Sequence, residues 1–176
     1  PTLISDFNDV ESHLEHPDKL FNYLNEAKKV EAWSPSDGKT SSLVKNYLRF
    51  WELLGLLFVN FKHRLSCQNL AFQGMASRKA LGSVNKWLLE KKPAKDSICY
   101  IGFNAMSPCE EQIMRFLIVE GIAEVFWDAD SYYLNDKKQE AGKYLRQHLL
   151  WSEFEKRPFN WISSSLKKPK EINVYG

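Results

Sequence analysis

The sequence predicts an α/β protein in which a bundle of helices precedes a small parallel sheet. Two features of the chain lead to this fold class. In the first half, apolar residues recur at steps of three and four, the spacing of a helix with one buried face. After Lys95, short apolar runs alternate with helical patterns, as is typical of parallel strands joined by crossover helices. We therefore expect a helical subdomain over residues 1–95 and an α/β subdomain over residues 96–176.

Composition narrows the class of protein. The chain has 176 residues, of which 44% are hydrophobic, enough for one full core or two small ones. Its 24 Lys and Arg residues against 22 Asp and Glu give a formal net charge of +2, so net charge neither implies nor excludes a nucleic-acid partner. No apolar run is long enough to span a membrane, and the three cysteines lack disulfide-framework or zinc-site spacing. We expect a cytoplasmic protein with no membrane partner and no cofactor.

Three helices are expected before Lys95, joined by polar loops as an antiparallel bundle. The first begins with Asp18 as its cap. The second has the clearest pattern of the chain, and we expect the face formed by its regularly spaced apolar residues to be buried. These residues are Leu43, Tyr47, Phe50, Leu54, Leu57, Phe61 and Leu65. The third helix spans Asn69 to Glu90 and ends shortly before Pro93.

Strands and helices alternate in the second half. Ile98–Phe103 is a nearly continuous apolar run, which predicts a strand buried on both faces. A helix follows, because Ser107, Pro108 and Glu110 supply an N-cap, a first-turn proline and the acid of a capping box. The next elements are expected in the order strand, helix, strand, at Ala123–Trp127, Gln139–Leu150 and Glu171–Tyr175. Together these elements predict a βαβαβ unit with a narrow parallel sheet of three strands.

Three aspartates follow the second expected strand and form the acidic group best placed for chemistry. Asp128, Asp130 and Asp136 lie beyond the carboxyl end of a strand, where α/β proteins bind ligands and metals. One hypothesis is therefore a small metal-dependent hydrolase that uses Asp128 and Asp130, with Asp136 as a further ligand. The alternative is that these loop carboxylates cap the following helix.

Basic and aromatic residues supply candidates for nucleic-acid contact. The basic candidates are Arg64, Arg78, Lys79 and Lys86. They lie on expected helices, where they either meet phosphates or form a solvated face. Tyr132 and Tyr133 follow a strand; exposed rings there would stack on the bases of a single strand, and buried rings would fill the core. A further hypothesis is a protein-interaction module in which the long helix Leu43–Leu65 docks a partner helix.

The order of these features resembles a known family. The segments concerned are Gln73–Arg78 (QGMASR), Ile98–Leu117 (ICYIGFNAMSPCEEQIMRFL), Ala123–Asp136 (AEVFWDADSYYLND) and Gln139–Leu149 (QEAGKYLRQHL). In this order they resemble the AddB-type subunit of bacterial recombination nuclease-helicases, most closely its Bacteroidetes-like branch in the PD-(D/E)xK nuclease superfamily. In that family the amino-terminal half is similar to a UvrD-like superfamily 1 helicase, and a nuclease domain lies near the carboxyl terminus. The resemblance covers essentially the whole chain.

The resemblance implies a fragment of the inactivated helicase-like half. Residues 1–95 then correspond to the helical subdomain 1B, and residues 96–176 to part of the three-layer, RecA-like subdomain 1A. In active helicases the two adjacent strands carry a DExQ and a GDxxQ motif, whose acidic and amide groups hold magnesium and position water and phosphate. The matching, degenerate positions here are Ile101, Gly102, Asn104, Asp128 and Ser131. Only Asp128 keeps the residue type of its motif.

This comparison implies a chain without catalytic residues. It predicts no ATP hydrolysis, no bound metal and no cofactor for the chain itself. The implied role is to supply DNA-contacting and scaffold surface within a DNA repair and recombination protein. The implied partners are DNA and a helicase-nuclease partner subunit.

Overall fold

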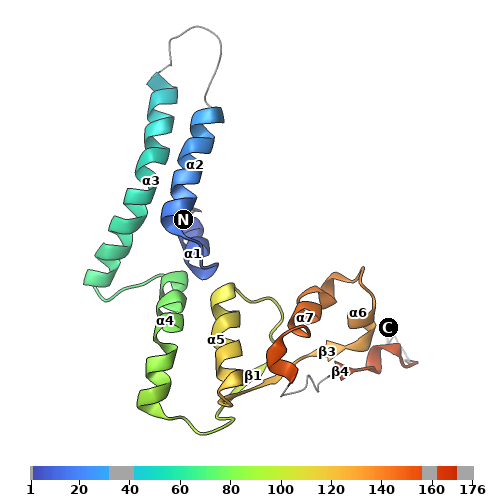
Figure 1. Cartoon of the computed structure of the whole chain (residues 1–176). Coiled ribbons are helices and arrows are strands. Elements are labelled where there is room, and N and C mark those ends of the chain that lie inside the picture. The colour runs from blue at the N-terminus through green and yellow to red at the C-terminus, as the bar shows by residue number, and fades with distance from the viewer. Residues whose placement is uncertain (1, 32–41, 156–161, 170–176) are drawn as a thin grey trace, which may run out of the picture. The chain divides into compact units, whose positions relative to one another are not determined.

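The computed structural model describes residues 2–31, 42–155 and 162–169 (Figure 1). These residues form a mostly helical α/β fold, in which helices come first and short parallel strands interleaved with helices follow. Contacts divide the chain into two compact units, Pro1–Val84 and Asn85–Gly176. The division therefore falls within a helix and not at Lys95, where the composition changes. Among the residues described, no helix is both long and apolar enough to cross a membrane.

Helices alone build the described part of the first unit. They are α1 (Thr2–Ser12), α2 (Pro17–Glu31), α3 (Ser42–Cys67) and the first part of α4 (Gln73–Lys91). Helices α2 and α3 run side by side in opposite directions, as predicted (Figure 1). Helix α1 is not among the expected helices, although Phe7 and Val10 have helical spacing. Asp18 lies in the first turn of α2 and does not cap it, because the helix already begins at Pro17, a residue suited to the first helical position.

The core of the first unit is aromatic. Phe7 of α1, Phe21 of α2 and Phe58 of α3 are buried, and their ring centroids lie between 4.9 and 6.2 Å apart. Val10 and Leu54 complete this buried cluster. Aromatic pairs at such distances contribute about 0.5–1.5 kcal/mol each beyond the area that they bury. The three rings therefore hold α1, α2 and α3 together at one point.

The buried face of α3 differs from the predicted one. Of the seven regularly spaced apolar residues, Leu54 is buried and Phe61 and Leu65 are half-buried. The other four are exposed: Leu43, Tyr47, Phe50 and Leu57. The prediction that this whole face is covered is therefore wrong. The neighbouring helices cover only a stripe through Leu54 and Phe58, because one antiparallel partner cannot surround so long a helix.

A buried carboxylate joins three helices of the first unit. Glu11 of α1 is 1% exposed and pairs with Lys62 of α3 and with Arg78 of α4, whose Nε lies 3.2 Å from Oε2 of Glu11. Arg78 Nη2 also donates a hydrogen bond of 2.6 Å to the carbonyl oxygen of Glu15. Removing one partner of such a group leaves an uncompensated buried charge, which is strongly destabilising. The Glu11 cluster (Glu11, Lys62 and Arg78) therefore fixes the way in which these helices pack.

Helix α4 meets α1 at a glycine. The Gly74 N–H donates to Oδ1 of Asn8 at 2.6 Å. A Cβ atom at this position would lie 2.3 Å from the carbonyl oxygen of Asn8, which is backbone and cannot swing aside. Only a glycine therefore permits this close approach.

We predict that Gly74→Ala lowers the free energy of unfolding by about 1–3 kcal/mol, because the added methyl group forces the two helix backbones apart. Urea unfolding followed by circular dichroism measures this change. Gly82→Ala, in the same helix, is the matched control, because a Cβ there meets no atom within 4 Å. It should raise stability by up to about 1 kcal/mol, since alanine is the better helix former. Equal effects of the two substitutions would contradict the packing described.

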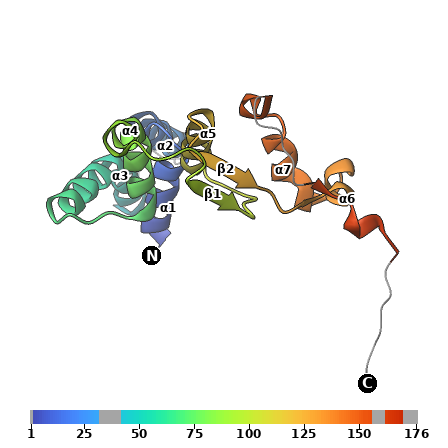
Figure 2. The same cartoon turned by 90° about the horizontal axis from the view of Figure 1, so that it is seen from below.

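Two parallel strands and a crossover helix form the centre of the second unit. Strand β1 (Ile98–Ile101) pairs in parallel with β2 (Ala123–Phe126), and Ile98 lies opposite Ala123. Helix α5 (Pro108–Val119) connects the two strands and packs against the sheet (Figure 2). The strand–helix–strand order predicted for this segment is confirmed.

Helix α5 begins as the sequence predicts. Ser107 is its N-cap and Pro108 its first residue. The Glu110 N–H donates to Oγ of Ser107 at 3.4 Å, and the Ser107 N–H donates to Oε2 of Glu110 at 2.8 Å. This reciprocal capping box satisfies backbone donors that the first turn of a helix leaves free.

Strand β1 is not buried on both faces, so this prediction is wrong. Ile98 and Tyr100 are half-buried, whereas Cys99 is exposed and Ile101 is 71% exposed. Side chains alternate between the two faces of a strand, so one face of β1 is covered and the other is open. Two strands with a single crossover helix provide cover for one face only.

The rest of the second unit consists of short elements. Strand β3 (Ala129–Asp130) pairs in parallel with β4 (Ile162–Ser163), so the described residues contain two sheets of two strands each. The predicted third strand, Glu171–Tyr175, lies outside the described residues. The helical elements are α6 (Ser131–Asn135), η1 (Glu140–Gly142), α7 (Lys143–His148), η2 (Ser152–Glu155) and η3 (Ser165–Lys167), the η elements being 3-10 turns. The segment predicted as one helix from 139 to 150 is thus divided into η1 and α7.

Candidate functional site

The segments that follow β1 and β2 leave the sheet at the same edge. Parallel strands end on the same side, and here the Gly102 N–H donates to the Phe126 carbonyl oxygen at 3.0 Å. The motif positions on these segments are Ile101, Gly102 and Asn104 for β1, and Asp128 and Ser131 for β2. The structure thus brings together the two segments that the sequence predicts to be neighbours.

The side chains at this edge offer little for phosphoryl-transfer chemistry. Asn104 and Asp128 are exposed, and Asp128 is the one carboxylate among the five motif positions. Magnesium is held by oxygen ligands, above all carboxylates, so a single exposed aspartate is a poor site for it. The part of the chain that the structure describes contains no group of three or more His, Cys, Asp or Glu residues able to hold a metal ion.

Asp130, the next carboxylate along the chain, is buried and accepts four hydrogen bonds. Its Oδ1 accepts from the Tyr132 N–H at 2.9 Å and so caps α6. Its Oδ2 accepts from the hydroxyls of Ser163 and Ser165, at 2.7 and 3.2 Å. The Leu166 N–H adds a fourth bond to Oδ2 at 3.1 Å. These bonds, first that from Tyr132, lower the pKa of Asp130 from 3.8 to about 2. Both oxygens are therefore used to join β3, α6, β4 and η3.

The other two aspartates do not join Asp130 in a shared site. Asp128 is exposed, and Oδ1 of Asp136 accepts from the Lys138 N–H at 2.9 Å, within its own turn. The three carboxylates thus serve different local purposes. This arrangement fits the capping alternative for Asp130 and gives no geometric support to a hydrolase that uses Asp128 and Asp130.

Arg146 of α7 fixes the loop that follows α6. Its Nη1 donates to the carbonyl oxygens of Tyr133 and Asp136, at 2.8 and 3.2 Å, and its Nη2 donates to that of Gln139 at 2.9 Å. Gly142 makes room for this contact, because a Cβ there would lie 2.4 Å from the Tyr133 oxygen. The guanidinium group has several donors in a rigid plane, which suits it to bind several carbonyl groups at once. Arg146 is therefore a structural residue, and its sequence context does not reveal this.

An imidazole is buried between two tryptophans in the same unit. The ring centroid of His148 lies 4.7 Å from that of Trp127 and 4.6 Å from that of Trp151, and the side chain is fully buried. Neither ring nitrogen has a hydrogen-bond partner among the described residues, and Oε1 of Glu111 lies 3.6 Å from Nε2. Burial lowers the pKa of His148 from 6.5 to about 4. The ring is therefore neutral at neutral pH and acts as a core residue.

We predict that His148 makes the protein less stable in mild acid. The unfolded chain binds a proton at this position near pH 6.5, whereas the folded protein binds it only near pH 4. Stability due to this group is therefore complete above pH 6.5 and falls by about 3 kcal/mol as the pH is lowered to 4. Urea unfolding at a series of pH values measures the slope of the free energy of unfolding against pH.

The control variants for this prediction are His148→Phe and His13→Gln. His148→Phe keeps a ring in the aromatic core and removes the titrating group, so the slope between pH 6.5 and 4 should largely disappear. His13 is exposed, and its replacement should leave the slope unchanged. If stability still falls with pH in His148→Phe, another group is responsible. Glu153 would be the first to examine, because its hydrogen bonds, first that from Arg115, together outweigh burial and lower its pKa.

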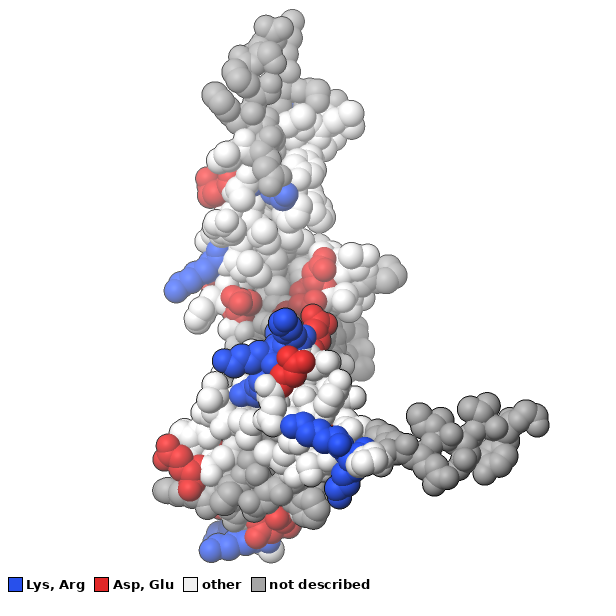
Figure 3. Space-filling view, turned by 90° about the vertical axis from the view of Figure 1, so that its right-hand side faces the viewer, with Lys and Arg blue, Asp and Glu red and all other residues white. Residues whose placement is uncertain are grey.

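The basic candidates for DNA contact differ in availability. Arg64, Lys79 and Lys86 are exposed, whereas Arg78 is held in the Glu11 cluster. On the face drawn in Figure 3, Lys and Arg alternate with Asp and Glu, and the described residues form no continuous basic stripe there. Any phosphate contact on that face would therefore come from a few separate side chains.

The two tyrosine candidates lie next to each other at the start of α6. Tyr132 is 45% exposed and Tyr133 is half-buried. Their ring centroids are 5.3 Å apart, and the rings meet edge to face. Tyr132 therefore has a ring available for stacking, and Tyr133 supports it.

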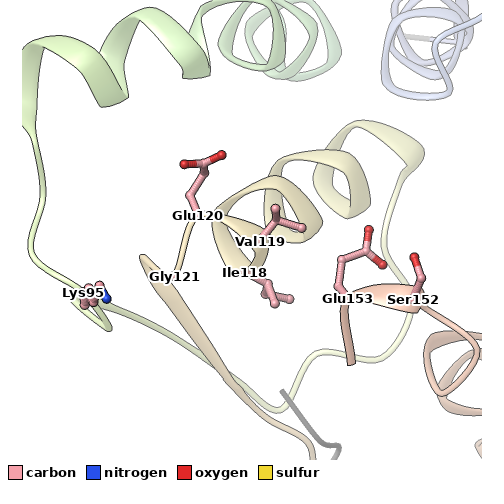
Figure 4. A pocket seen from close by; sticks show the side chains of 7 residues that line it. All are labelled: Lys95, Ile118, Val119, Glu120, Gly121, Ser152 and Glu153. Carbon is pink, nitrogen blue, oxygen red and sulfur yellow. The ribbon is translucent and has the colours of Figure 1, made fainter. Parts of the chain in front are cut away.

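A cavity of about 400 Å³ lies where α5 ends and η2 begins (Figure 4). Lys95, Glu120, Ser152 and Glu153 are among the residues that line it. Figure 4 shows Lys95 and Glu153 on opposite sides, with the Glu120 carboxylate turned away from both. Glu153 Oε1 already accepts from Arg115 Nε at 2.8 Å. The polar groups of this cavity therefore do not converge on a point where a reacting atom would sit.

Comparison with known proteins adds no family to this description. No family model matches the chain, and neither the curated proteins nor the solved structures include a match. The functional inference therefore depends on the residues and the geometry described above.

Proposed function

We propose that this chain is a non-catalytic, helicase-like module of a DNA repair and recombination nuclease-helicase subunit, which supplies DNA-contacting and scaffold surface. One observation carries this proposal. Strands β1 and β2 are parallel neighbours, as two helicase motif strands would be, yet the segments that leave them lack the groups that hydrolyse ATP. In this interpretation, residues 1–95 are the 1B-like helical insertion and residues 96–176 are part of a three-layer, RecA-like subdomain.

The missing groups explain why the module would be inactive. Hydrolysis of a nucleoside triphosphate needs a carboxylate on magnesium, a group that positions water and a contact to the γ-phosphate. The motif positions hold Ile101, Gly102 and Asn104 at and after the end of β1, and Ser131 beyond β2. Catalysis of this kind consists almost entirely of positioning and electrostatic stabilisation, so loss of these groups removes its basis.

In this proposal, exposed side chains of the chain make the contacts to DNA. Tyr132 presents its ring just beyond β3, and a base of single-stranded DNA stacks on such a ring without sequence preference. Lys86, Lys79 and Arg64 are the exposed cations for phosphate groups. Because these cations are few and separate, we expect binding to be weak and to weaken further as salt is raised.

We predict no ATP hydrolysis above background, with or without single-stranded DNA, and weak binding of a fluorescently labelled oligodeoxythymidine at low salt. Phosphate release and fluorescence anisotropy measure these two properties on the same preparation. DNA-stimulated ATP hydrolysis would contradict the inactive assignment. Absence of DNA binding at low salt would contradict the DNA-contacting role.

A pair of tyrosine variants locates the DNA contact. Loss of one stacked ring costs about 1–3 kcal/mol, so Tyr132→Ala should weaken binding roughly fivefold or more. Tyr23→Ala is the matched control, because Tyr23 is an exposed tyrosine of α2 and lies outside the proposed contact. Equal binding by the two variants would place the contact elsewhere.

A further inference from the structure

Helix α3 carries exposed apolar side chains next to the stripe that packs in the core. Leu43, Phe50 and Leu57 recur every seven residues, and Leu53 lies between the last two. These four side chains, here called the α3 seam, are between 44% and 79% exposed. A seven-residue repeat with an apolar residue at an intermediate position is the pattern by which one helix packs along another.

Part of the α3 seam lies to one side of the buried stripe. Successive residues of an α-helix are about 100° apart, so Leu53 and Leu57 are each turned by about that angle from Leu54 and Phe58. Leu54 and Phe58 are buried, whereas Leu53 and Leu57 are exposed. Helices of a bundle meet their neighbours at similar angles, so a second helix has room along this side of α3.

The charges beside the α3 seam are positive. Arg64 continues its seven-residue repeat, Arg49 flanks it, and both are exposed. Glu52, the one carboxylate in the sequence of α3, lies on the other side of the helix, where it lines a groove of about 370 Å³ between α2 and α3. Asn46 and Asn60 lie seven residues before and after Leu53, and both are exposed. A helix seated on the seam would therefore meet arginines and no acid.

We propose that the α3 seam binds an amphipathic helix of a partner protein, whose apolar seven-residue repeat is flanked by acidic side chains. Charge complementarity determines that the partner helix is acidic beside its apolar residues, because acidic side chains there would pair with Arg49 and Arg64. A second copy of this chain is the poorer occupant, since two such seams bring together arginines without carboxylates. The proposal rests on the scaffold part of the proposed function. Its experiment uses no DNA, so failure of DNA binding and failure of this docking are separate results.

The test uses two synthetic helical peptides of about four heptads, with leucine at the apolar positions and either glutamate or lysine at the flanking positions. Fluorescence anisotropy of each labelled peptide against the full chain measures binding. The glutamate peptide should bind at least tenfold more tightly than the lysine peptide, and added salt should reduce this difference. The chain alone should have the mass of a monomer in light scattering. Equal binding of the two peptides, or a stable dimer of the chain, would overturn the proposal.

Variants on α3 locate the docking face. Leu53→Glu, or Leu53→Ala if the first fails to fold by circular dichroism, should weaken binding of the glutamate peptide at least fivefold. Val59→Glu is the control on the same helix, because Val59 is exposed on the side of the α2–α3 groove. Reversing both Arg49 and Arg64 to glutamate should make the lysine peptide the tighter ligand. If Val59→Glu loses binding and the Leu53 variants keep it, the peptide docks in the groove, and the proposal is overturned.

Discussion

The parallel pairing of β1 with β2 is the constraint on which the functional interpretation depends. Because the two strands run in the same direction, the chain must leave both at one edge of the sheet. Helix α5 makes this possible, since it returns the chain from the end of β1 to the start of β2. This geometry makes the segments Ile101–Asn104 and Trp127–Ser131 neighbours. Because they are neighbours, their lack of the groups of a nucleotide-hydrolysing site bears on function.

Several charged side chains hold the elements of each unit together. Glu11 and Arg78 join helices of the first unit, and Asp130 and Arg146 join short elements of the second. Each of these side chains already makes most of its hydrogen bonds or ion pairs with other protein atoms, so few of its polar atoms are left to bind a ligand. Function is therefore expected on exposed surfaces, such as the ring of Tyr132 and the open side of α3. Exposed surfaces of this kind are what the proposed scaffold role requires.

Local signals made some elements predictable from the sequence, and distant contacts made others unpredictable. The start of α5 depends on residues within four positions of one another, from Ser107 to Glu110, and the prediction is confirmed. The period of α3 shows which residues share a face, but whether Leu57 is covered depends on where α2 lies. The role of Asp130 depends on Ser163 and Leu166, which are far away in the chain. The sequence therefore leaves both capping and metal binding open for this residue.

Nuclear magnetic resonance contacts between the backbones of β1 and β2 test the central claim most directly. The parallel register predicts contacts between Ile98 and Ala123 and between Tyr100 and Val125, together with slow hydrogen exchange at the Gly102 amide. Contacts between Ile98 and Phe126 would instead indicate antiparallel strands. That result, or the absence of any contact between the two segments, would contradict the account.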